Sequence, residues 1–138
     1  MLDVFLDTDI AFDIVSKRTP HHVQSLKLIE KLERGEIYIH ISESIITNLI
    51  YLSFHSHKID HALLKIQKFV DLCRVSSSNK NVILQAMNSN FKDKEDAIQY
   101  HIALHNGLDY FISRNIKDYQ GFTSTIPVYT PQTFIESF

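Results

Sequence analysis

Short apolar runs that suit buried strands alternate along this chain with longer segments that carry apolar residues at helical spacing. The first pair stands at the N-terminus, where VFLD at 4–7 predicts a buried strand and DIAFDIVSK at 9–17 predicts a helix. Similar strands are predicted at 37–41, 72–76, 109–114 and 126–130. Strands that alternate with helices favour a parallel sheet covered on both faces, with right-handed crossovers. We therefore predict an α/β fold with a central parallel sheet of about five strands.

Capping residues mark the ends of the helices between these strands. Thr19 and Pro20 place a capping hydroxyl before a proline suited to a first helical turn, and Gly35 ends that helix. Asn106 and Gly107 form a similar stop later in the chain. The predicted helices span about 20–34, 42–56, 58–72, 79–88, 95–105 and 131–138.

Length and composition are those of a densely folded protein. The chain has 138 residues, 44% of them apolar, and only three glycines and three prolines, so we expect a single domain over residues 1–138. The formal net charge of −2 means that nucleic acid would have to meet a local basic patch. No stretch approaches the ~18 apolar residues of a membrane span. The acidic first residues are unlike a signal peptide, so we expect a cytoplasmic protein.

Four aspartates are placed where the predicted sheet would bring them together. Asp7 and Asp9 follow the first strand, whereas Asp96 and Asp118 come about a hundred residues later. Because the carboxyl ends of parallel strands face one crevice, these acids could converge there. Two carboxylates ~4 Å apart repel by roughly 4 kcal/mol at an effective dielectric constant near 20. We therefore expect a hard divalent cation, Mg²⁺ or Mn²⁺, to bind between them.

Three segments of the sequence resemble the PIN domain family of VapC-like toxin ribonucleases. They are LDTDIAFDIV at 6–15, ISESIITNLIYL at 41–52 and FKDKEDAIQYHIALHNGLDYFISRNIKDY at 91–119. The resemblance covers essentially the whole chain, and the third segment is the most specific. It implies a three-layer α/β/α sandwich whose clustered acids bind Mg²⁺ or Mn²⁺ and cleave single-stranded RNA. It also implies an antitoxin protein as partner and a homodimer.

The resemblance assigns roles to particular residues. Asp7 matches the first acid of the family and Asp96 the third, while Asn115 and Asp118 match the region of the fourth. Asp7, Asp96 and Asp118 are therefore the expected metal ligands, and Asn115 would help to orient water or a second metal. Asn48 stands where the family usually has glutamate, and we count it with the catalytic residues.

Basic residues near the last acids are the expected RNA contacts. Arg114 could meet the scissile phosphate, and Lys117 lies in the same loop. The stretch around Lys17 and Arg18 is interpreted as a solvated loop.

Simpler structural roles compete with these assignments. Asp7 could serve only as a helix N-cap, and Asp118 could merely cap its loop. Glu95 is expected to be solvated, because adjacent helical positions point ~100° apart and Asp96 would take the metal. Asp13, one turn after Asp9, is expected to be a surface acid. The histidines at 101 and 105 lack the intervening glutamate of a zinc-protease helix, so we expect no zinc site.

Two other functions remain open from the sequence. A haloacid-dehalogenase-type phosphatase also begins with an apolar strand and Asp-x-Asp, here Asp7 and Asp9. A degenerate PIN-like module would bind RNA or a protein without cutting, which Asn48 suggests because an amide brings no charge to a metal. Glu43 is a poor replacement, because it is ~140° from Asn48 around the helix. The sequence thus leads to the hypothesis of a slow, metal-demanding ribonuclease.

Overall fold

The computed structural model describes residues 1–17, 20–119, 121 and 125–138. Its centre is a five-stranded sheet in the order β3-β2-β1-β4-β5, and every neighbouring pair is parallel. The strands are β1 (Leu2–Leu6), β2 (Ile37–Ser42), β3 (Arg74–Ser76), β4 (Tyr110–Ile112) and β5 (Val128–Tyr129). The predicted parallel sheet of about five strands is confirmed.

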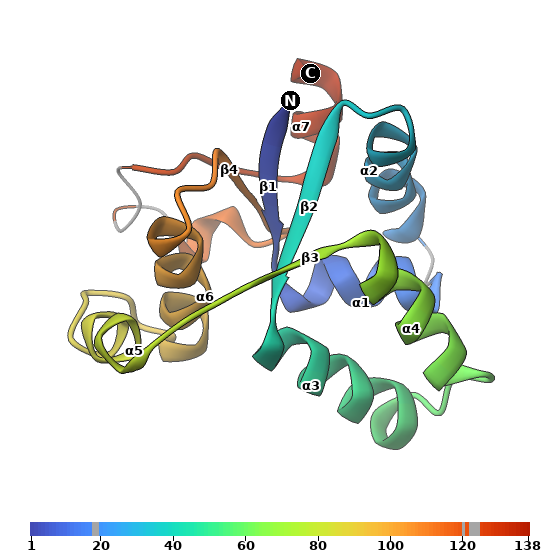
Figure 1. Ribbon diagram of the computed structural model, residues 1–138, viewed down its shortest axis with the longest axis horizontal. Helices are drawn as coiled ribbons and strands as arrows, with labels where there is room; N and C mark the ends of the chain where they lie inside the picture. The colour runs from blue at the N-terminus through green and yellow to red at the C-terminus, as the bar shows by residue number, and fades with distance from the viewer. Residues whose placement is uncertain (18–19, 120, 122–124) are drawn as a thin grey trace.

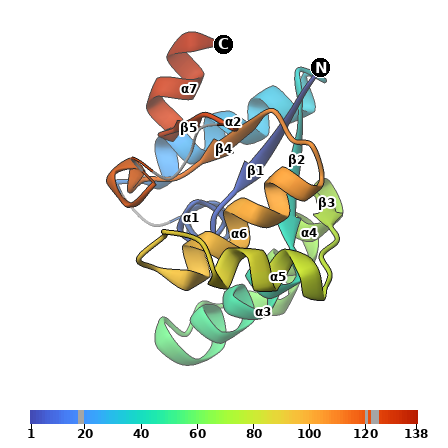
Figure 2. The ribbon, with the colours of Figure 1, turned by 90° about the vertical axis from the view of Figure 1, so that its left-hand side faces the viewer.

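Helices cover both faces of the sheet. Figure 1 shows α5 and α6 on one side and α1, α2 and α4 on the other, and the rotated view of Figure 2 again places α5 and α6 together. The α-helices are α1 (Thr8–Ser16), α2 (His22–Glu33), α3 (Glu43–Tyr51), α4 (Ala62–Leu72), α5 (Lys80–Met87), α6 (Lys94–His105) and α7 (Pro131–Ser137). This is the predicted three-layer α/β/α sandwich.

The central strand β1 forms the middle of the hydrophobic core. Val4, Phe5 and Leu6 are fully buried, and the ring of Phe5 stacks on Phe111 of β4 with centroids 5.2 Å apart. A strand with helices on both sides has no solvent-facing side, which explains why VFL is a continuous apolar run. The polar residue that follows, Asp7, marks the point where the chain leaves the core.

Two helices begin or end elsewhere than the periodicity predicts. The helix expected from residue 58 begins at Ala62, because Lys58 and His61 have φ values of 47° and 54° in the left-handed region. The helix expected over 42–56 ends at Tyr51, and residues Leu52–Ser56 form a π-helical turn. The predicted cap Thr19 and its neighbour Arg18 lie outside the described residues.

The strand order creates a crevice beside β1. From β1 the chain first adds β2 and β3 on one side, and then returns to add β4 and β5 on the other. The connections on the two sides run over opposite faces, so the carboxyl ends of β1 and β4 are left uncovered between them. The Asp7 backbone N–H donates to the Ile112 carbonyl at 3.2 Å, which places Asp7 at this opening. Within the described residues no helix is long and apolar enough to cross a membrane.

Candidate active site

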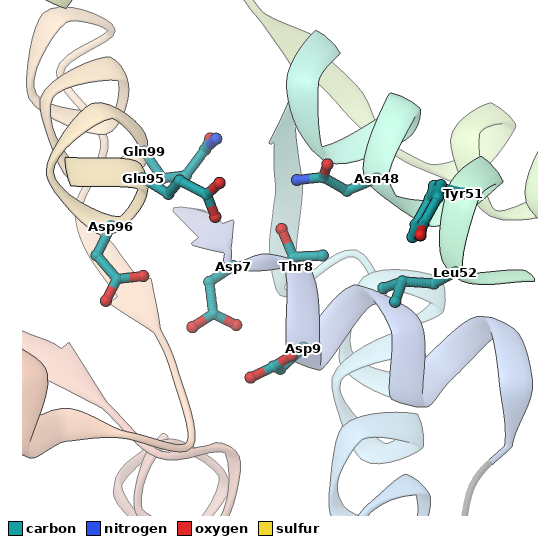
Figure 3. A pocket seen from close by; sticks show the side chains of 9 residues that line it. All are labelled: Asp7, Thr8, Asp9, Asn48, Tyr51, Leu52, Glu95, Asp96 and Gln99. Atoms are coloured by element: carbon teal, nitrogen blue, oxygen red, sulfur yellow. The ribbon is translucent and has the colours of Figure 1, made fainter. Parts of the chain in front are cut away.

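An acidic pocket of about 300 Å³ opens at the carboxyl end of β1 (Figure 3). Its walls come from the start of α1, the end of α3 and the first turns of α6. The lining residues are Asp7, Thr8, Asp9, Asn48, Tyr51, Leu52, Glu95, Asp96 and Gln99. Four of these nine are carboxylates, and no lysine or arginine is among them. Among the described residues, the pocket lining therefore carries concentrated negative charge and no cationic side chain.

Asp7 fulfils both of the roles that its sequence position allows. Its Oδ1 accepts a hydrogen bond from the Ile10 N–H at 3.2 Å, so the residue is the N-cap of α1. Its side chain also lines the pocket (Figure 3). Burial raises the pKa of Asp7 to about 7; hydrogen bonds from Ser113 and Ile10 oppose this rise, and the charges of Asp9 and Asp96 add to it. Capping thus fixes the carboxylate at the mouth of the crevice.

Asp96 reaches the same pocket from the first turn of α6. The N-cap Asp93 holds this turn by accepting from the N–H groups of Glu95 at 2.9 Å and Asp96 at 3.1 Å. Burial, followed by the charges of Asp93 and Asp118, raises the pKa of Asp96 to about 6, while a hydrogen bond with Tyr119 lowers it. The aspartates that were predicted to converge are therefore close enough for the charge of one to raise the pKa of another.

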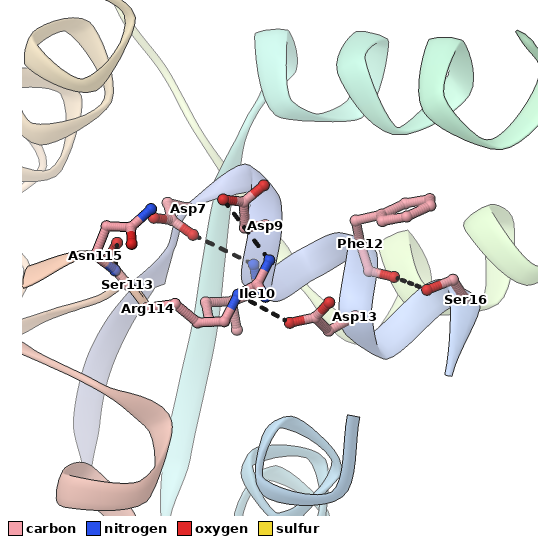
Figure 4. Close-up of polar contacts among 9 residues, drawn as sticks. All are labelled: Asp7, Asp9, Ile10, Phe12, Asp13, Ser16, Ser113, Arg114 and Asn115. Atoms are coloured by element: carbon pink, nitrogen blue, oxygen red, sulfur yellow. Dashed lines mark hydrogen bonds and ion pairs between the residues drawn. The ribbon is translucent and has the colours of Figure 1, made fainter. Parts of the chain in front are cut away.

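The other predicted site residues lie in the segment after β4. Asn115 precedes a short 3₁₀ turn, Ile116–Asp118, that contains Lys117 and Asp118. All three side chains are exposed and do not line the pocket. Figure 4 draws Asn115 next to Asp7, where β4 ends. Thus the pocket contains Asp7, Asn48 and Asp96, while Asp118 is related to it through its electrostatic effect on Asp96.

Asp13 is not the surface acid that the sequence predicts. It is completely buried, and its Oδ2 lies 3.3 Å from Nε of Arg114. Nη2 of the same arginine lies 3.8 Å from Oδ2 of Asp9 (Figure 4). Asp9 and Asp13 are four residues apart and share one face of α1, and that face turns toward the segment after β4. Arg114 is therefore engaged in an ion pair that links α1 to β4.

Several lining residues were missed by the sequence analysis. Glu95, which was expected to be solvated, is exposed, and it also lines the pocket beside Asp96. Tyr51 was given no role from the sequence, yet it lines the pocket and is 61% exposed where α3 passes into the π-helical turn. The spacing of Glu95, Asp96 and Gln99 along α6 could have indicated Gln99, because positions three and four apart share a helix face.

Gln99 is held in place by hydrogen bonds to the start of α3. Its Oε1 accepts from Ser42 Oγ at 2.6 Å, and its Nε2 donates to Ser44 Oγ at 2.7 Å. These bonds tie α6 to the end of β2 and to the first turn of α3. The two walls that carry Asp96 and Asn48 are thereby fixed relative to each other.

The donor set fits a hard divalent cation. Among the described residues, no three His, Cys, Asp or Glu side chains form a closed metal-binding group. Mg²⁺ does not require one, because it usually takes one or two protein carboxylates and keeps several of its own waters. The pocket offers carboxylate and amide oxygens, and in the described part of the chain no lysine or arginine competes for them. This chemistry suits Mg²⁺ or Mn²⁺.

A larger groove of about 920 Å³ runs between α3, α5 and α6, but it lacks a comparable set of acids. Val75, Leu84 and Met87 contribute exposed apolar side chains to it, and its charged lining residues are Glu43 and Lys80. Chemistry on a phosphodiester requires charge and oxygen ligands, so the smaller acidic pocket is the better candidate.

Comparisons with known proteins give a consistent result. Residues 3–117 match the sequence model of the PIN domain. The chain is 29% identical to Ribonuclease VapC1 of Aquifex aeolicus, over 96% of this chain and 93% of that protein. Among solved structures, the DNA-bound VapBC of Salmonella typhimurium matches with a TM-score of 0.71 and 17% identity, over 95% of this chain and 99% of the other.

Further structures share the same fold. VapBC2 of Rickettsia felis, bound to a DNA fragment from its promoter, matches with a TM-score of 0.70 and 15% identity, over 93% of this chain and 99% of the other. VapC20 of Mycobacterium tuberculosis, described as a toxin that cleaves the sarcin-ricin loop, matches with a TM-score of 0.66 and 13% identity, over 90% and 99%. At such low identity these structures establish the architecture.

Proposed function

Because the chain belongs to the PIN domain family, we propose that it is a divalent-metal-dependent ribonuclease that cleaves single-stranded RNA. The observation that carries the proposal is the pocket at the end of β1, in which Asp7, Asp9, Glu95 and Asp96 gather and no other described lining residue is a cation. The relationship to a protein named as a ribonuclease supports the same reaction. Because the chain belongs to the PIN domain family, we no longer propose the phosphatase that the Asp7-x-Asp9 pattern had left open. On this reading residues 1–138 form one PIN-like domain.

The proposed metal ligands are Asp7, Asp96 and Asp118, and the proposed metal is Mg²⁺ or Mn²⁺. When bound, the cation would neutralise the phosphodiester and make a water molecule more nucleophilic. Asn115, exposed beside Asp7, would orient that water. Asn48 would contribute an amide oxygen from the opposite wall.

Other residues of this chain would bind and orient the RNA. Lys117 is exposed in the 3₁₀ turn and is a proposed phosphate contact. Arg114 uses Nε and Nη2 toward Asp13 and Asp9, and its remaining N–H groups are proposed to face a phosphate. Tyr51, exposed at the pocket, offers a ring on which a base could stack. Since the pocket is negative, RNA should bind well only when a divalent cation is present.

We further propose that the chain acts as the toxin of a toxin–antitoxin pair in the cytoplasm, inhibited by a cognate antitoxin protein, and that it forms a homodimer. Support for the antitoxin comes from structural neighbours that are VapBC complexes and from a relative named VapC1. An antitoxin that occludes the acidic pocket would stop cleavage directly.

A growth experiment tests this proposal. Wild type, Asp96→Asn and Asp71→Asn are induced separately in a bacterial host; Asp71 is an exposed aspartate of α4 outside the pocket and serves as the matched control. We expect growth arrest with wild type and Asp71→Asn, no arrest with Asp96→Asn, and relief when the gene immediately upstream is co-expressed. Equal effects of wild type and Asp96→Asn on growth would contradict the toxin assignment.

Asn48 supports a second candidate function, a PIN-like module that binds RNA or protein without cutting. An asparagine lines the pocket where the resemblance places a glutamate, so the chain has one carboxylate fewer on that wall. Such a module would retain RNA at equal length after prolonged incubation with Mn²⁺. A ribonuclease would shorten it.

A further inference from the structure

Two polar side chains face each other across the acidic pocket and are not used by the fold. Figure 3 shows the Glu95 carboxylate pointing into the pocket from α6 and the Asn48 amide pointing into it from α3. Both residues are exposed. Within the described part of the chain, neither side chain makes a hydrogen bond or an ion pair. Polar groups that are oriented into a site but do not stabilise the fold are available for a ligand.

The geometry of α6 sends Glu95 and Asp96 into different parts of the same pocket. Adjacent helical residues project ~100° apart, so both side chains cannot approach from one direction. In Figure 3 the Asp96 carboxylate lies to the left of Asp7, whereas the Glu95 carboxylate lies above Asp7 and faces Asn48. The two hydrogen bonds from Asp93 hold the backbone of both residues in this first turn. The longer side chain of glutamate extends its carboxylate toward the facing wall.

We propose that Glu95 supplies the carboxylate that this chain lacks at Asn48, and that it binds the divalent cation on the Asn48 side of the pocket. Compared with the family pattern, a carboxylate is missing from the α3 wall and present on the α6 wall. The Asn48 side of the pocket thus keeps its oxygen ligands. This inference rests on the proposed function. It implies that Asn48 does not by itself make the protein a weak metal binder.

A purely structural role for Glu95 makes a different prediction. A negative side chain in the first turn of a helix interacts favourably with the helix dipole, typically by 0.3–1 kcal/mol. Glu43 has the same side chain in the first turn of α3, is exposed, and lies outside the acidic pocket. Glu43→Gln is therefore the matched control, since it removes the same charge from the same kind of position.

The test is calorimetric titration of the folded protein with Mn²⁺, which requires no RNA and no turnover. The variants are Glu95→Gln, Glu43→Gln, Asn48→Glu and the double variant Glu95→Gln/Asn48→Glu, with Asp7→Asn as the site knockout. We expect Glu95→Gln to weaken Mn²⁺ binding by about 10-fold or more, and Glu43→Gln by less than about two-fold. Asn48→Glu should strengthen binding about 10-fold in the Glu95→Gln background and less than about three-fold in wild type, because neighbouring residues are not additive.

Each outcome has a separate meaning. Wild-type affinity in Glu95→Gln, or an equal effect of Asn48→Glu in both backgrounds, would overturn the role of Glu95. If Asp7→Asn abolishes binding in the same series, the proposed ribonuclease site survives that result. Absence of any Mn²⁺ binding by the wild-type chain would overturn both the role of Glu95 and the proposed function.

Discussion

At the scale of single residues, Asp7 carries the largest electrostatic cost in the pocket. Burial raises the pKa of its carboxyl from 3.8 to about 7. Without metal, the folded protein therefore keeps a proton on Asp7 that the unfolded chain has already released above about pH 4. A folded state that binds more protons loses stability as the pH rises. The stability cost of Asp7 thus develops between about pH 4 and pH 7 and is fully present above pH 7.

The substitution Asp7→Asn should remove this pH dependence, because asparagine cannot ionise. The pKa change corresponds to at most about 4 kcal/mol, and we expect about 1–3 kcal/mol because the side chain is only partly buried. The free energies of unfolding of wild type and Asp7→Asn are to be measured by urea denaturation with EDTA at pH 4.5 and pH 8. The variant should gain stability relative to wild type at the higher pH. A difference that stays constant with pH would contradict the cost assigned to Asp7.

The ion pair between Arg114 and the buried Asp13 predicts a second effect at this scale. Arg114→Gln takes a cationic partner away from the fully buried Asp13 carboxylate, and breaking a buried ion pair typically costs about 3 kcal/mol or more. Arg114→Gln should therefore lower the free energy of unfolding by about 2–4 kcal/mol, as measured by denaturant titration at pH 7. Lys117→Gln, an exposed substitution three residues away, should change it by less than about 0.5 kcal/mol. A loss below 1 kcal/mol for Arg114→Gln would show that the pair is not structural.

At the scale of secondary structure, the start of α6 positions two carboxylates of the pocket. Asp93 caps the helix by accepting from the N–H groups of Glu95 and Asp96. Loss of an N-cap side chain typically costs about 1 kcal/mol and loosens the first turn. Glu95 and Asp96 both belong to that turn, so the cap is expected to control metal binding as well as stability.

Asp93→Ala should therefore lower the free energy of unfolding by about 1 kcal/mol and also weaken Mn²⁺ binding several-fold. Asp93→Asn keeps a capping oxygen and should retain most of the stability. Thr130→Ala removes the N-cap of α7, which accepts from Thr133 at 3.1 Å, and should cost similar stability with unchanged Mn²⁺ affinity. Thermal unfolding and calorimetric titration measure the two effects. If Asp93→Ala and Thr130→Ala affect Mn²⁺ affinity equally, α6 does not orient the site.

Most elements could be predicted from the sequence because their signals are local. The buried run VFL, the caps at Ser42 and Thr130 and the Asn106-Gly107 stop all depend on neighbouring residues. The start of α4 at Ala62 depends on left-handed backbone at Lys58 and His61, a conformation that neither lysine nor histidine indicates in a sequence. A search for a 3.6-residue period likewise cannot reveal the π-helical turn after Tyr51.

The site was predictable only where topology determines it. The position of Asp7 was predictable because the strand ends meet at one edge of the sheet. The position of Asp96 was predictable because a helix starts beside that edge. The pairing of Asp13 with Arg114 joins residues a hundred positions apart, and no local pattern indicates it. Glu95 was left out of the expected ligands because neighbouring helical side chains point ~100° apart, yet its exposed side chain lines the pocket. Side chains that point in different directions from the first turn of a helix can line the same pocket.

At the scale of the whole molecule, the order of strands accounts for the position of the site. The chain adds strands first on one side of β1 and then on the other, which leaves the carboxyl ends of β1 and β4 open. Acidic residues follow β1 and lie at the start of α6, next to that opening. On the proposed function, a bound divalent cation would offset the cost of gathering these charges. We therefore propose that one acidic pocket both binds the metal and cleaves the RNA.

Single-turnover cleavage of a panel of mixed-sequence single-stranded RNAs in Mn²⁺ tests this claim most directly. Wild type is to be compared with Asp7→Asn and with Asp71→Asn, an aspartate outside the pocket. We expect cleavage by wild type and Asp71→Asn, loss of cleavage with EDTA, and a rate at least about 100-fold lower for Asp7→Asn. RNA that wild type binds but leaves intact in Mn²⁺, or cleavage that proceeds equally in Asp7→Asn, would contradict it.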